Sequence, residues 1–297
     1  MDLLAGPGLG ALCALGSALL WGVTSLLVRT LTHTINAVTV NAVRSVLAGA
    51  LLLAWVLATH GLGALTAMSA WTFMLLSVSI VLALAVGDSM FFESTRALGL
   101  GRAMTISTTY PLISAVLAVT FLGEVVTAPV VVGSVITLGG LALIVGGRAD
   151  DAQIQPGRFW PGVAQASVAS IAWAVSVVFL KAPLAELDAT VAQAVRLPLA
   201  GLLLLATPWA RGAARHLAAG GRGAVGRMAA LVVLTAVSSV MFVASVKYAG
   251  ITLATVLSST APMFAIPLGF VFLGERLPAV ALVGAAITVA GLVVLRL

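Results

Sequence analysis

The chain has little charge, one cysteine and no clustered histidines. Asp, Glu, Lys and Arg make up 8% of its 297 residues, whereas soluble domains carry about 25%. The single cysteine, Cys13, excludes a disulfide framework and a cysteine-based zinc site. His33, His60 and His216 are predicted in loops away from acidic clusters, and the sequence contains no H-E-x-x-H, G-x-S-x-G or Walker A motif. We therefore expect no enzyme, no cofactor and no bound metal.

Hydrophobic residues are abundant instead. They form 61% of the chain, and the mean hydropathy is +1.19. Such a chain cannot cover a water-facing surface and is typical of a membrane protein that crosses the bilayer many times. The net charge of +6 does not indicate nucleic-acid binding, because most arginines stand singly at the ends of apolar segments.

Long apolar runs predict the membrane spans. A span needs about 20 apolar residues, and the runs lack the alternation of barrel strands, so we expect an all-α protein. No basic residues precede the first run, which argues against a cleaved signal peptide. The predicted transmembrane helices are ten: 9–29, 36–58, 71–96, 102–123, 129–147, 161–181, 189–209, 228–247, 251–273 and 278–296.

The sequence contains an internal repeat. A shift of 152 residues superposes Ala42–Ala54 on Ala194–Ala206 with ten identities in thirteen positions. A shift of 151 superposes the F-L-G-E of 121–124 on that of 272–275. The same two shifts pair further residues: Trp21 with Trp173, Arg29 with Lys181, Arg96 with Lys247, Gly99 with Gly250, Pro111 with Pro262, Gly133 with Gly284, and Gly140 with Gly291. We predict one five-helix repeat over residues 1–147, a linker loop over 148–160 and a second repeat over 161–297.

An odd number of spans in each repeat has a topological consequence. The second copy must enter the membrane from the opposite side, so the two halves form an inverted repeat. Such a pair can enclose a central cavity and expose it first to one face and then to the other. This arrangement predicts transport by alternating access.

These repeated features also resemble a known family. The paired Trp, the Arg in the second span, the Pro in the fourth, the closing F-L-G-E and the Gly-rich fifth span are similar, in order and spacing, to the EamA-type repeat of the drug/metabolite transporter superfamily. The resemblance implies ten helices, with helices five and ten at the periphery. It also implies transport of amino acids, other metabolites, nucleotide-sugars or drugs, and it favours export.

Positive charge predicts the orientation. The loops on one side of the ten spans hold ten arginines, and the other side holds Lys181, Lys247 and Arg296. Because basic loops stay in the cytoplasm, we expect both termini outside the cell. The ten are Arg29, Arg96, Arg102, Arg148, Arg158, Arg211, Arg215, Arg222, Arg227 and Arg276.

Two arginines are predicted near the middle of the membrane. Arg44 and Arg196 lie about eight residues inside their spans, roughly 12 Å along a helix. An arginine at this depth costs about 2.5 to 3.5 kcal/mol, so it needs a partner. Depth matching predicts Asp88 for Arg44, with Glu275 at the same face, and Glu124 for Arg196. Each arginine has two alternative roles, a structural ion pair or a clamp for an anionic substrate.

Two acids break the symmetry between the copies. Asp88 and Glu93 have no acidic counterpart in the second half. A carboxylate in an apolar helix can take up and release a coupling proton. The alternatives are that Asp88 neutralises Arg44 and that Glu93 pairs with Arg96 on the same helix.

Polar and aromatic residues elsewhere in the spans complete the candidate site. Polar runs precede Pro111 and Pro262, and a proline inside a helix frees a carbonyl and supplies a hinge. Trp21, Tyr110 and Trp173 lie in mid-span, where they line a cavity or fill the core. The candidate substrate-binding residues are Trp21, Asn41, Arg44, Ser107, Tyr110, Trp173, Gln193, Arg196, Ser258 and Ser259. The candidate coupling or gating residues are Asp88, Glu93, Pro111, Glu124, Pro262 and Glu275.

The sequence therefore predicts a secondary transporter. We expect it in the bacterial inner membrane, moving small polar or amphipathic metabolites such as amino acids, with the lipid bilayer and a small-molecule substrate as partners. Proton coupling, exchange and a homodimer are open alternatives, and nucleic acid is not expected. The rival functions are a membrane-embedded enzyme, a channel, and a drug or nucleotide-sugar carrier of the same fold.

Overall fold

The computed structural model describes residues 6–32, 35–98, 103, 106–146, 157–212, 220–261, 263–264 and 279–294. Within these residues the chain is helical and contains no strand. The predicted all-α class is therefore confirmed. Its cause is the apolar composition, because a helix satisfies its own backbone hydrogen bonds where water is absent.

Eight elements are described in the first half. Asn36 and Ser69 begin two of them by accepting hydrogen bonds from the backbone N–H groups of Val38 and Thr72. The elements are α1 (Pro7–Thr32), α2 (Ala37–Thr59), α3 (Gly63–Thr66), α4 (Ala70–Ile80), the π-helix η1 (Val81–Asp88), α5 (Ser89–Leu98), α7 (Tyr110–Leu122) and α8 (Ala128–Gly146). Because α4, η1 and α5 follow one another without a break, they form one long crossing.

The second half repeats this order. Its elements are α9 (Phe159–Lys181), α10 (Pro183–Glu186), α11 (Ala189–Leu205), the 3₁₀ turn η3 (Pro208–Ala210), α13 (Gly221–Ala249), α14 (Ile251–Ser258) and α16 (Ala279–Val294). One boundary lies seven residues before its predicted position. The helix expected from residue 228 begins at Gly221, so Arg222 and Arg227 lie on its first turns and not in a loop.

The helices match the predicted spans closely. In the described residues, five helical segments are long and apolar enough to cross a membrane, and four shorter apolar helices lie in four further predicted spans. The ninth predicted span begins with α14 and continues into residues outside the described ranges. The count of ten therefore stays a prediction, while a helical protein of many crossings is confirmed.

The packing of the helices repeats across the two halves. Three pairs join equivalent crossings: α2 packs on α11, α8 packs on α16, and α7, which follows the turn in the fourth crossing, packs on α14, which precedes the turn in the ninth. A fourth pairing occurs twice, since α1 packs on α13 and α9 packs on the α4–η1–α5 crossing. A two-fold axis that exchanges the halves produces this pattern.

Glycine contacts repeat in the same way. A Cβ on Gly49 would meet the ring of Pro198, and a Cβ on the equivalent Gly201 would meet Val46, which is equivalent to Pro198. Likewise, a Cβ on Gly140 would meet Thr288, and a Cβ on the equivalent Gly291 would meet Thr137, which is equivalent to Thr288. Close approach at these crossings needs glycine. Gly139, next to Gly140 in the sequence, faces open space instead.

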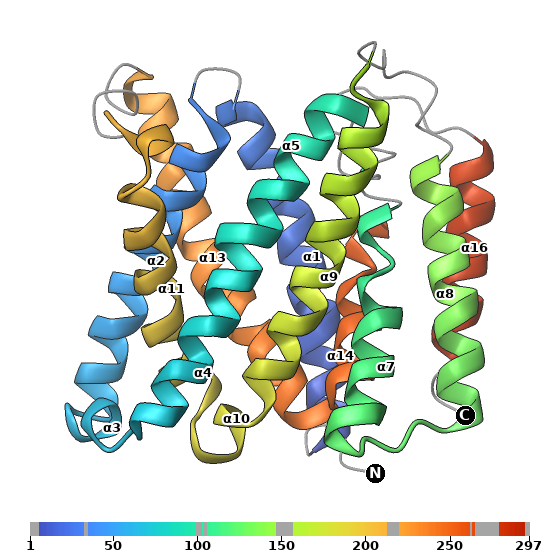
Figure 1. Cartoon of the computed structure of the whole chain (residues 1–297), viewed down its shortest axis with the longest axis horizontal. Helices are drawn as coiled ribbons and strands as arrows, with labels where there is room; N and C mark the ends of the chain where they lie inside the picture. The colour runs from blue at the N-terminus through green and yellow to red at the C-terminus, as the bar shows by residue number, and fades with distance from the viewer. Residues whose placement is uncertain are drawn as a thin grey trace.

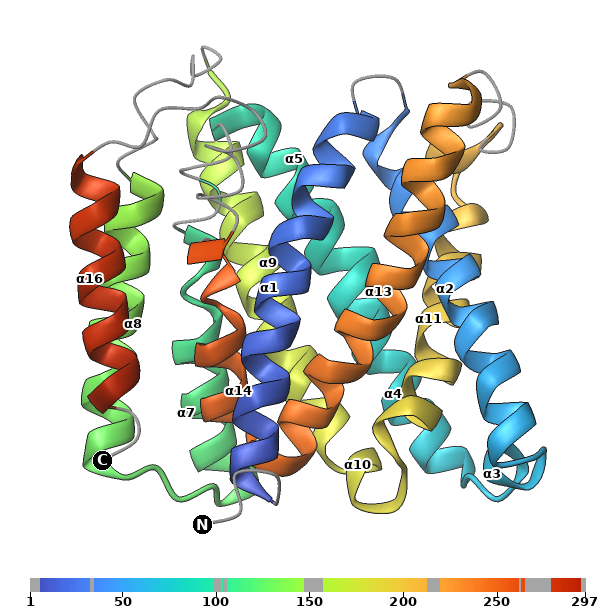
Figure 2. The same ribbon diagram turned by 180° about the vertical axis from the view of Figure 1, so that it is seen from behind.

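The two halves run in opposite directions. In Figures 1 and 2, α1 runs upward from the face that holds the N-terminus, whereas its equivalent α9 runs downward from the opposite face. The chain ends on the face where it began. The helices α8 and α16 stand together at one end of the molecule (Figure 1), as the family resemblance implies. The inverted orientation follows from the odd number of crossings in each half.

The two faces differ in charge. Arg158 and Arg222 lie at the beginnings of α9 and α13, on the upper face in Figure 1, and both are exposed. Lys181 and Lys247 lie at the ends of the same helices, on the face of the termini. This distribution agrees with the charge asymmetry on which the predicted orientation depends.

Cysteine labelling tests this orientation. In a Cys13→Ala background, we expect Val125→Cys to react with an impermeant maleimide in intact cells, because Val125 is 88% exposed on the face of the termini. Arg222→Cys, on the basic face, should react only after permeabilisation. The opposite labelling pattern would place the termini in the cytoplasm.

Candidate functional site

Arg44 and Asp88 form a buried ion pair between α2 and the end of η1. Arg44 Nη2 lies 3.6 Å from Asp88 Oδ2, and the two residues are 3% and 7% exposed. Arg44 Nε also donates to Asn41 Oδ1 at 2.9 Å, and its guanidinium stands 5.3 Å from the ring centroid of Trp21. The pairing predicted from depth is confirmed. Arg44 therefore has a counter-charge, an amide acceptor and an aromatic face, all from the first half.

Trp173 brings the second half to this pair. Its indole N–H is shared between Asp88 Oδ1 and the carbonyl of Ala83, each at 3.1 Å. The ring lies against Gly87, where a Cβ would come within 2.5 Å of it. Glycine at this position therefore lets the indole reach the carboxylate. The contact joins α9 to η1, that is, one half to the other.

Two further aromatic rings surround Trp173. Phe91 and Tyr110 lie with their ring centroids 5.4 and 5.9 Å from that of Trp173. The hydroxyl of Tyr110 donates to the carbonyl of Thr255 at 3.3 Å. Tyr110 and Trp173 are only partly buried. Two of the predicted aromatic residues, Tyr110 and Trp173, thus gather with Phe91 of α5, which was not predicted, while the third, Trp21, lies at Arg44.

The crossings that contain the two prolines are broken, not merely kinked. A turn at Thr108–Thr109 interrupts the helix before α7, and the equivalent turn at Ser259–Thr260 follows α14. Pro111 consequently lies in the first turn of α7, where its missing N–H costs no hydrogen bond. The predicted mid-helix kink at Pro111 is therefore wrong, because the preceding polar residues leave the helix first.

Hydroxyl groups at the broken crossing contact α9. Thr109 Oγ1 lies 2.9 Å from Ser170 Oγ, and Ser107 Oγ donates to the carbonyl of Ala166 at 3.4 Å. Breaks at equivalent positions of two inverted halves are typical of transporter binding sites. Ser107 and Tyr110 lie at the first break, and Ser258 and Ser259 lie at the second.

Arg196, on α11, has no acidic partner among the described residues. It is 4% exposed. Its Nη1 donates to Gln193 Oε1 at 2.9 Å, and its Nη2 donates to Ser79 Oγ at 3.0 Å. No carboxylate in the described ranges lies within ion-pair distance of it, and its Nε has no hydrogen-bond partner there. The amide three residues earlier repeats the Asn41–Arg44 pairing, whereas the counter-charge is not repeated.

Sequence reasoning missed Ser79 and Ser176. Besides accepting from Arg196, Ser79 Oγ donates to the carbonyl of Ser176 at 2.8 Å, and Ser176 Oγ donates back to the carbonyl of Ser79 at 2.7 Å. These reciprocal bonds join α4 to α9. The only sequence signal was a small polar residue inside a long apolar run, which does not identify a partner.

The predicted pairing of Glu124 with Arg196 is wrong. Glu124 accepts hydrogen bonds at the beginning of α14, from the N–H of Ile251 at 2.8 Å, and from the N–H and hydroxyl of Thr252 at 3.2 and 2.9 Å. A helix N-terminus carries unpaired N–H groups and partial positive charge, so it attracts a carboxylate. Gly123, in the left-handed region with φ 63°, ends α7 and turns the chain toward this contact. The F-L-G-E of the first half thus ends one helix and caps another.

Removing this cap should destabilise the protein measurably. We expect Glu124→Ala to lower the free energy of unfolding by about 1.5 to 3 kcal/mol, the range for charge-assisted hydrogen bonds. Thermal unfolding in detergent would measure the change. Glu186→Ala provides the control, because this carboxylate accepts one hydroxyl hydrogen bond, from Thr72 at 3.0 Å. Equal losses in the two variants would contradict the capping role.

Of the remaining predicted site residues, the structure describes only Glu93. Glu93 lies on α5 and is partly buried; its predicted partner Arg96 has no described side chain. Pro262 and Glu275 lie outside the described residues, so their predicted roles stay predictions. Cys13, in α1, is free and partly buried.

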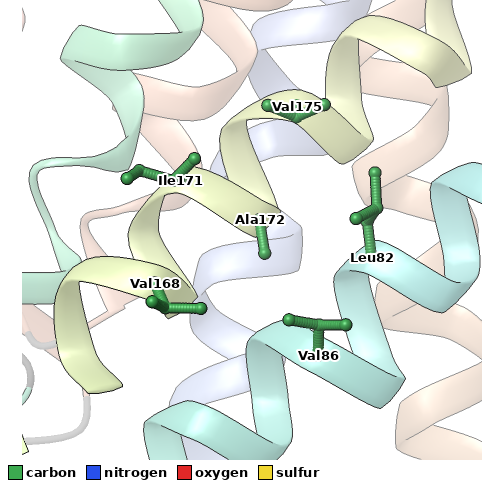
Figure 3. A pocket seen from close by; sticks show the side chains of 6 residues that line it. All are labelled: Leu82, Val86, Val168, Ile171, Ala172 and Val175. Atoms are coloured by element: carbon green, nitrogen blue, oxygen red, sulfur yellow. The ribbon is translucent and has the colours of Figure 1, made fainter. Parts of the chain in front are cut away.

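Two hollows are described, and neither is the predicted central cavity. One, of about 250 Å³, lies between η1 and α9 (Figure 3). Aliphatic side chains line it: Leu82, Val86, Val168, Ile171, Ala172 and Val175. The other lies near His60 and Asp188. Val168 and Ile171 are exposed, so the first hollow suits hydrocarbon and not a charged group. The central cavity stays a prediction.

Comparison with known proteins identifies the family. The sequence model of the EamA-like transporter family matches residues 8–146 and, a second time, residues 160–297. The chain belongs to the EamA-like transporter family. The resemblance stated from the repeated residues is thereby confirmed. Membership makes the chain a multi-pass membrane protein of a transporter family.

Other comparisons concern the fold. No curated protein matches the chain. Among the solved structures that match, one described only as the crystal structure of a protein has a TM-score of 0.76 at 20% sequence identity. The match covers 96% of this chain and 94% of the other. At this identity the match shows that the two chains share a fold, and it shows nothing about substrate.

Proposed function

We propose that this EamA-like protein is a secondary carrier of small polar or amphipathic metabolites, such as amino acids, and that it works by alternating access. One observation carries the proposal: buried polar groups from both halves meet across an inverted repeat. Asp88, on η1, contacts Arg44 of its own half and Trp173 of the other. Rearrangement of one half against the other must change the contact between Asp88 and Trp173.

The substrate site in this proposal lies among the buried arginines and the aromatic cluster. Trp173, Tyr110 and Phe91 offer flat apolar faces. The turns before α7 and after α14 interrupt helices, so polar backbone can be reached by a ligand there. Such a mixture suits a small solute with a charged end and an apolar end. We further propose that the carrier exports its solute across a bacterial inner membrane.

Counterflow in liposomes tests the carrier function. Protein reconstituted with unlabelled L-leucine inside should accumulate labelled L-leucine from outside above its equilibrium level, because a carrier exchanges solutes one for one. An amino-acid panel extends the assay to other side chains. Conductance without stimulation by internal solute would instead support a channel.

An imposed pH gradient separates proton coupling from simple exchange. If Asp88 carries the coupling proton, the gradient should drive uptake by the wild-type protein and not by Asp88→Asn, while counterflow persists in the variant. If Asp88 serves only to neutralise Arg44, the gradient should have the same effect on both proteins. The ion pair supports the second alternative.

A further inference from the structure

The two buried arginines differ in whether a carboxylate balances their charge. Arg44 has Asp88 at ion-pair distance, whereas Arg196 donates only to neutral acceptors, Gln193 and Ser79. We propose that Arg196, and not Arg44, binds the carboxylate of the transported solute. This inference rests on the proposed carrier function and assigns the charged end of the solute to one side chain.

The acids of the described residues are engaged elsewhere. Asp88 pairs with Arg44, and Glu124 caps α14. Glu186 accepts from Thr72, and Asp188 lies 3.4 Å from Lys247. Glu93 lies five residues beyond Asp88, on α5. None of these five carboxylates approaches Arg196 within ion-pair distance. An anion brought by the solute would therefore supply the missing charge.

The surroundings of Arg196 make such an anion favourable. A buried ion without a counter-charge carries a desolvation penalty of several kcal/mol. The neighbouring helix positions Val191 and Leu197 belong to a buried hydrophobic cluster that also contains Ile80 and Leu84. In so apolar a region an ion pair is little screened. A carboxylate on this guanidinium would be held strongly, while the apolar body of the solute would contact aliphatic side chains.

The guanidinium is oriented before any ligand arrives. Gln193 and Ser79 each hold one terminal nitrogen, and Nε is buried with no hydrogen-bond partner in the described part of the chain. Carboxylates bind arginine through two parallel N–H groups, and Nε with one terminal nitrogen is such a pair. A carboxylate that takes this edge must share or replace one of the two neutral acceptors.

Ser79 connects this binding event to the movement of the two halves. It accepts from Arg196 and also bonds reciprocally with Ser176 of α9. Because α4 and α9 belong to different halves, an anion that draws Arg196 away from Ser79 changes a contact between them. Binding is thereby linked to the interface on which alternating access depends.

The solute's amino group is not part of this recognition. Ser79, which touches Arg196, and Asp88 are nine residues apart on one crossing, about two helical turns. The carboxylate and ammonium of an α-amino acid are too close together to reach both. The ligand class is therefore a small monocarboxylate with an apolar body, with or without an amino group.

Three related probes test the assignment. L-leucine has both groups, 4-methylpentanoate has only the carboxylate, and L-leucinamide has only the amine. We expect the first two to bind the purified protein in nanodiscs, measured by tryptophan fluorescence, and L-leucinamide to bind at least about tenfold more weakly. That factor corresponds to the loss of about 1.4 kcal/mol, at the lower end for hydrogen bonds to a charged group.

Arg196→Gln should abolish the preference for a carboxylate, so that the three probes differ by less than about threefold. Arg222→Gln, at the exposed beginning of α13, is the matched control and should keep the wild-type preference. The unliganded Arg196→Gln protein should unfold at a temperature equal to or above that of the wild type, because an unneutralised buried charge is removed. A purely structural arginine predicts a lower temperature instead.

The outcomes separate this inference from the carrier function. An unchanged carboxylate preference in Arg196→Gln, or wild-type binding of L-leucinamide as tight as that of L-leucine, would overturn the assignment. Carboxylate-selective binding that depends on Arg196, without counterflow in liposomes, would support the assignment and contradict the carrier. Counterflow by a wild-type protein that prefers L-leucinamide would support the carrier function and contradict the assignment of Arg196.

Discussion

Replacing Asp88 by Asn should lower the free energy of unfolding by about 3 to 5 kcal/mol, the cost of leaving one partner of a buried ion pair alone. The amide keeps the shape of the side chain and can still accept from the indole of Trp173. What it removes is the negative charge 3.6 Å from Arg44 Nη2. Unfolding in bicelles, followed by circular dichroism, would measure the loss.

Two comparisons isolate the charge effect. Arg44→Met combined with Asp88→Asn should recover most of the lost stability, because no buried charge is left without a partner. Asp188→Asn breaks a pair of similar length, 3.4 Å, whose carboxylate side chain is 62% exposed. Since exposed pairs contribute about 0 to 1 kcal/mol, this variant should stay near the wild type. Equal losses in Asp88→Asn and Asp188→Asn would refute the argument.

Adding one methyl group at Gly201 should lower stability by about 2 to 3 kcal/mol, in the upper part of the range for overpacked cores. The Cβ of Gly201→Ala would lie 2.5 Å from the backbone nitrogen of Val46 and 3.0 Å from the carbonyl oxygen of Ala42. Backbone atoms cannot rotate away, so α2 and α11 must separate. The same unfolding assay measures this loss.

Gly139→Ala is the matched control for Gly201→Ala. Both glycines are helical, but a Cβ at Gly139 meets nothing within 4 Å. Alanine there should stabilise the helix by about 0.5 to 1 kcal/mol through its higher propensity. Removing the Val46 methyls in a Val46→Ala, Gly201→Ala protein should restore only part of the loss, because the backbone contacts persist. Full recovery would mean that side chains alone limit the approach.

The crossing of α2 and α11 also carries both arginines. Arg44 lies five residues before Gly49, and Arg196 lies five residues before Gly201. Separation of the helices in Gly201→Ala would therefore displace both guanidinium groups. For this reason stability and ligand binding should fall together in this variant, whereas Arg196→Gln is expected to lose binding alone.

Much of the fold could be predicted from periodicity and duplication. Spans followed from runs of apolar residues, and the inverted arrangement followed from five spans per copy, since an odd number of crossings reverses the second copy. The pairing of Arg44 with Asp88 followed from depth, because two residues counted from the same face of the membrane lie at the same level. Each of these inferences uses distance along a helix axis alone.

Predictions that depended on the direction in which a side chain points around the helix axis failed. Glu124 was matched to Arg196 by depth, yet its carboxylate faces the N-terminus of α14 in the folded protein. Direction around the helix also decides that Gly140 faces the partner helix and the adjacent Gly139 does not. The break before Pro111 was also missed; there Thr109 Oγ1 donates to the carbonyl of Ile106 and so competes with the helical hydrogen bonds.

The amino-acid sequence alone determined the class of this protein, its duplication and the family to which it belongs. Hydrophobic length and internal similarity depend only on the order of residues along the chain. The tertiary structure decided which buried charges are neutralised. That choice depends on which faces of α2, η1, α9 and α11 meet, and a few tens of degrees of helix rotation change the neighbours of a guanidinium completely. Arg44 and Arg196 stand in nearly identical sequence, and only packing gives one of them a carboxylate.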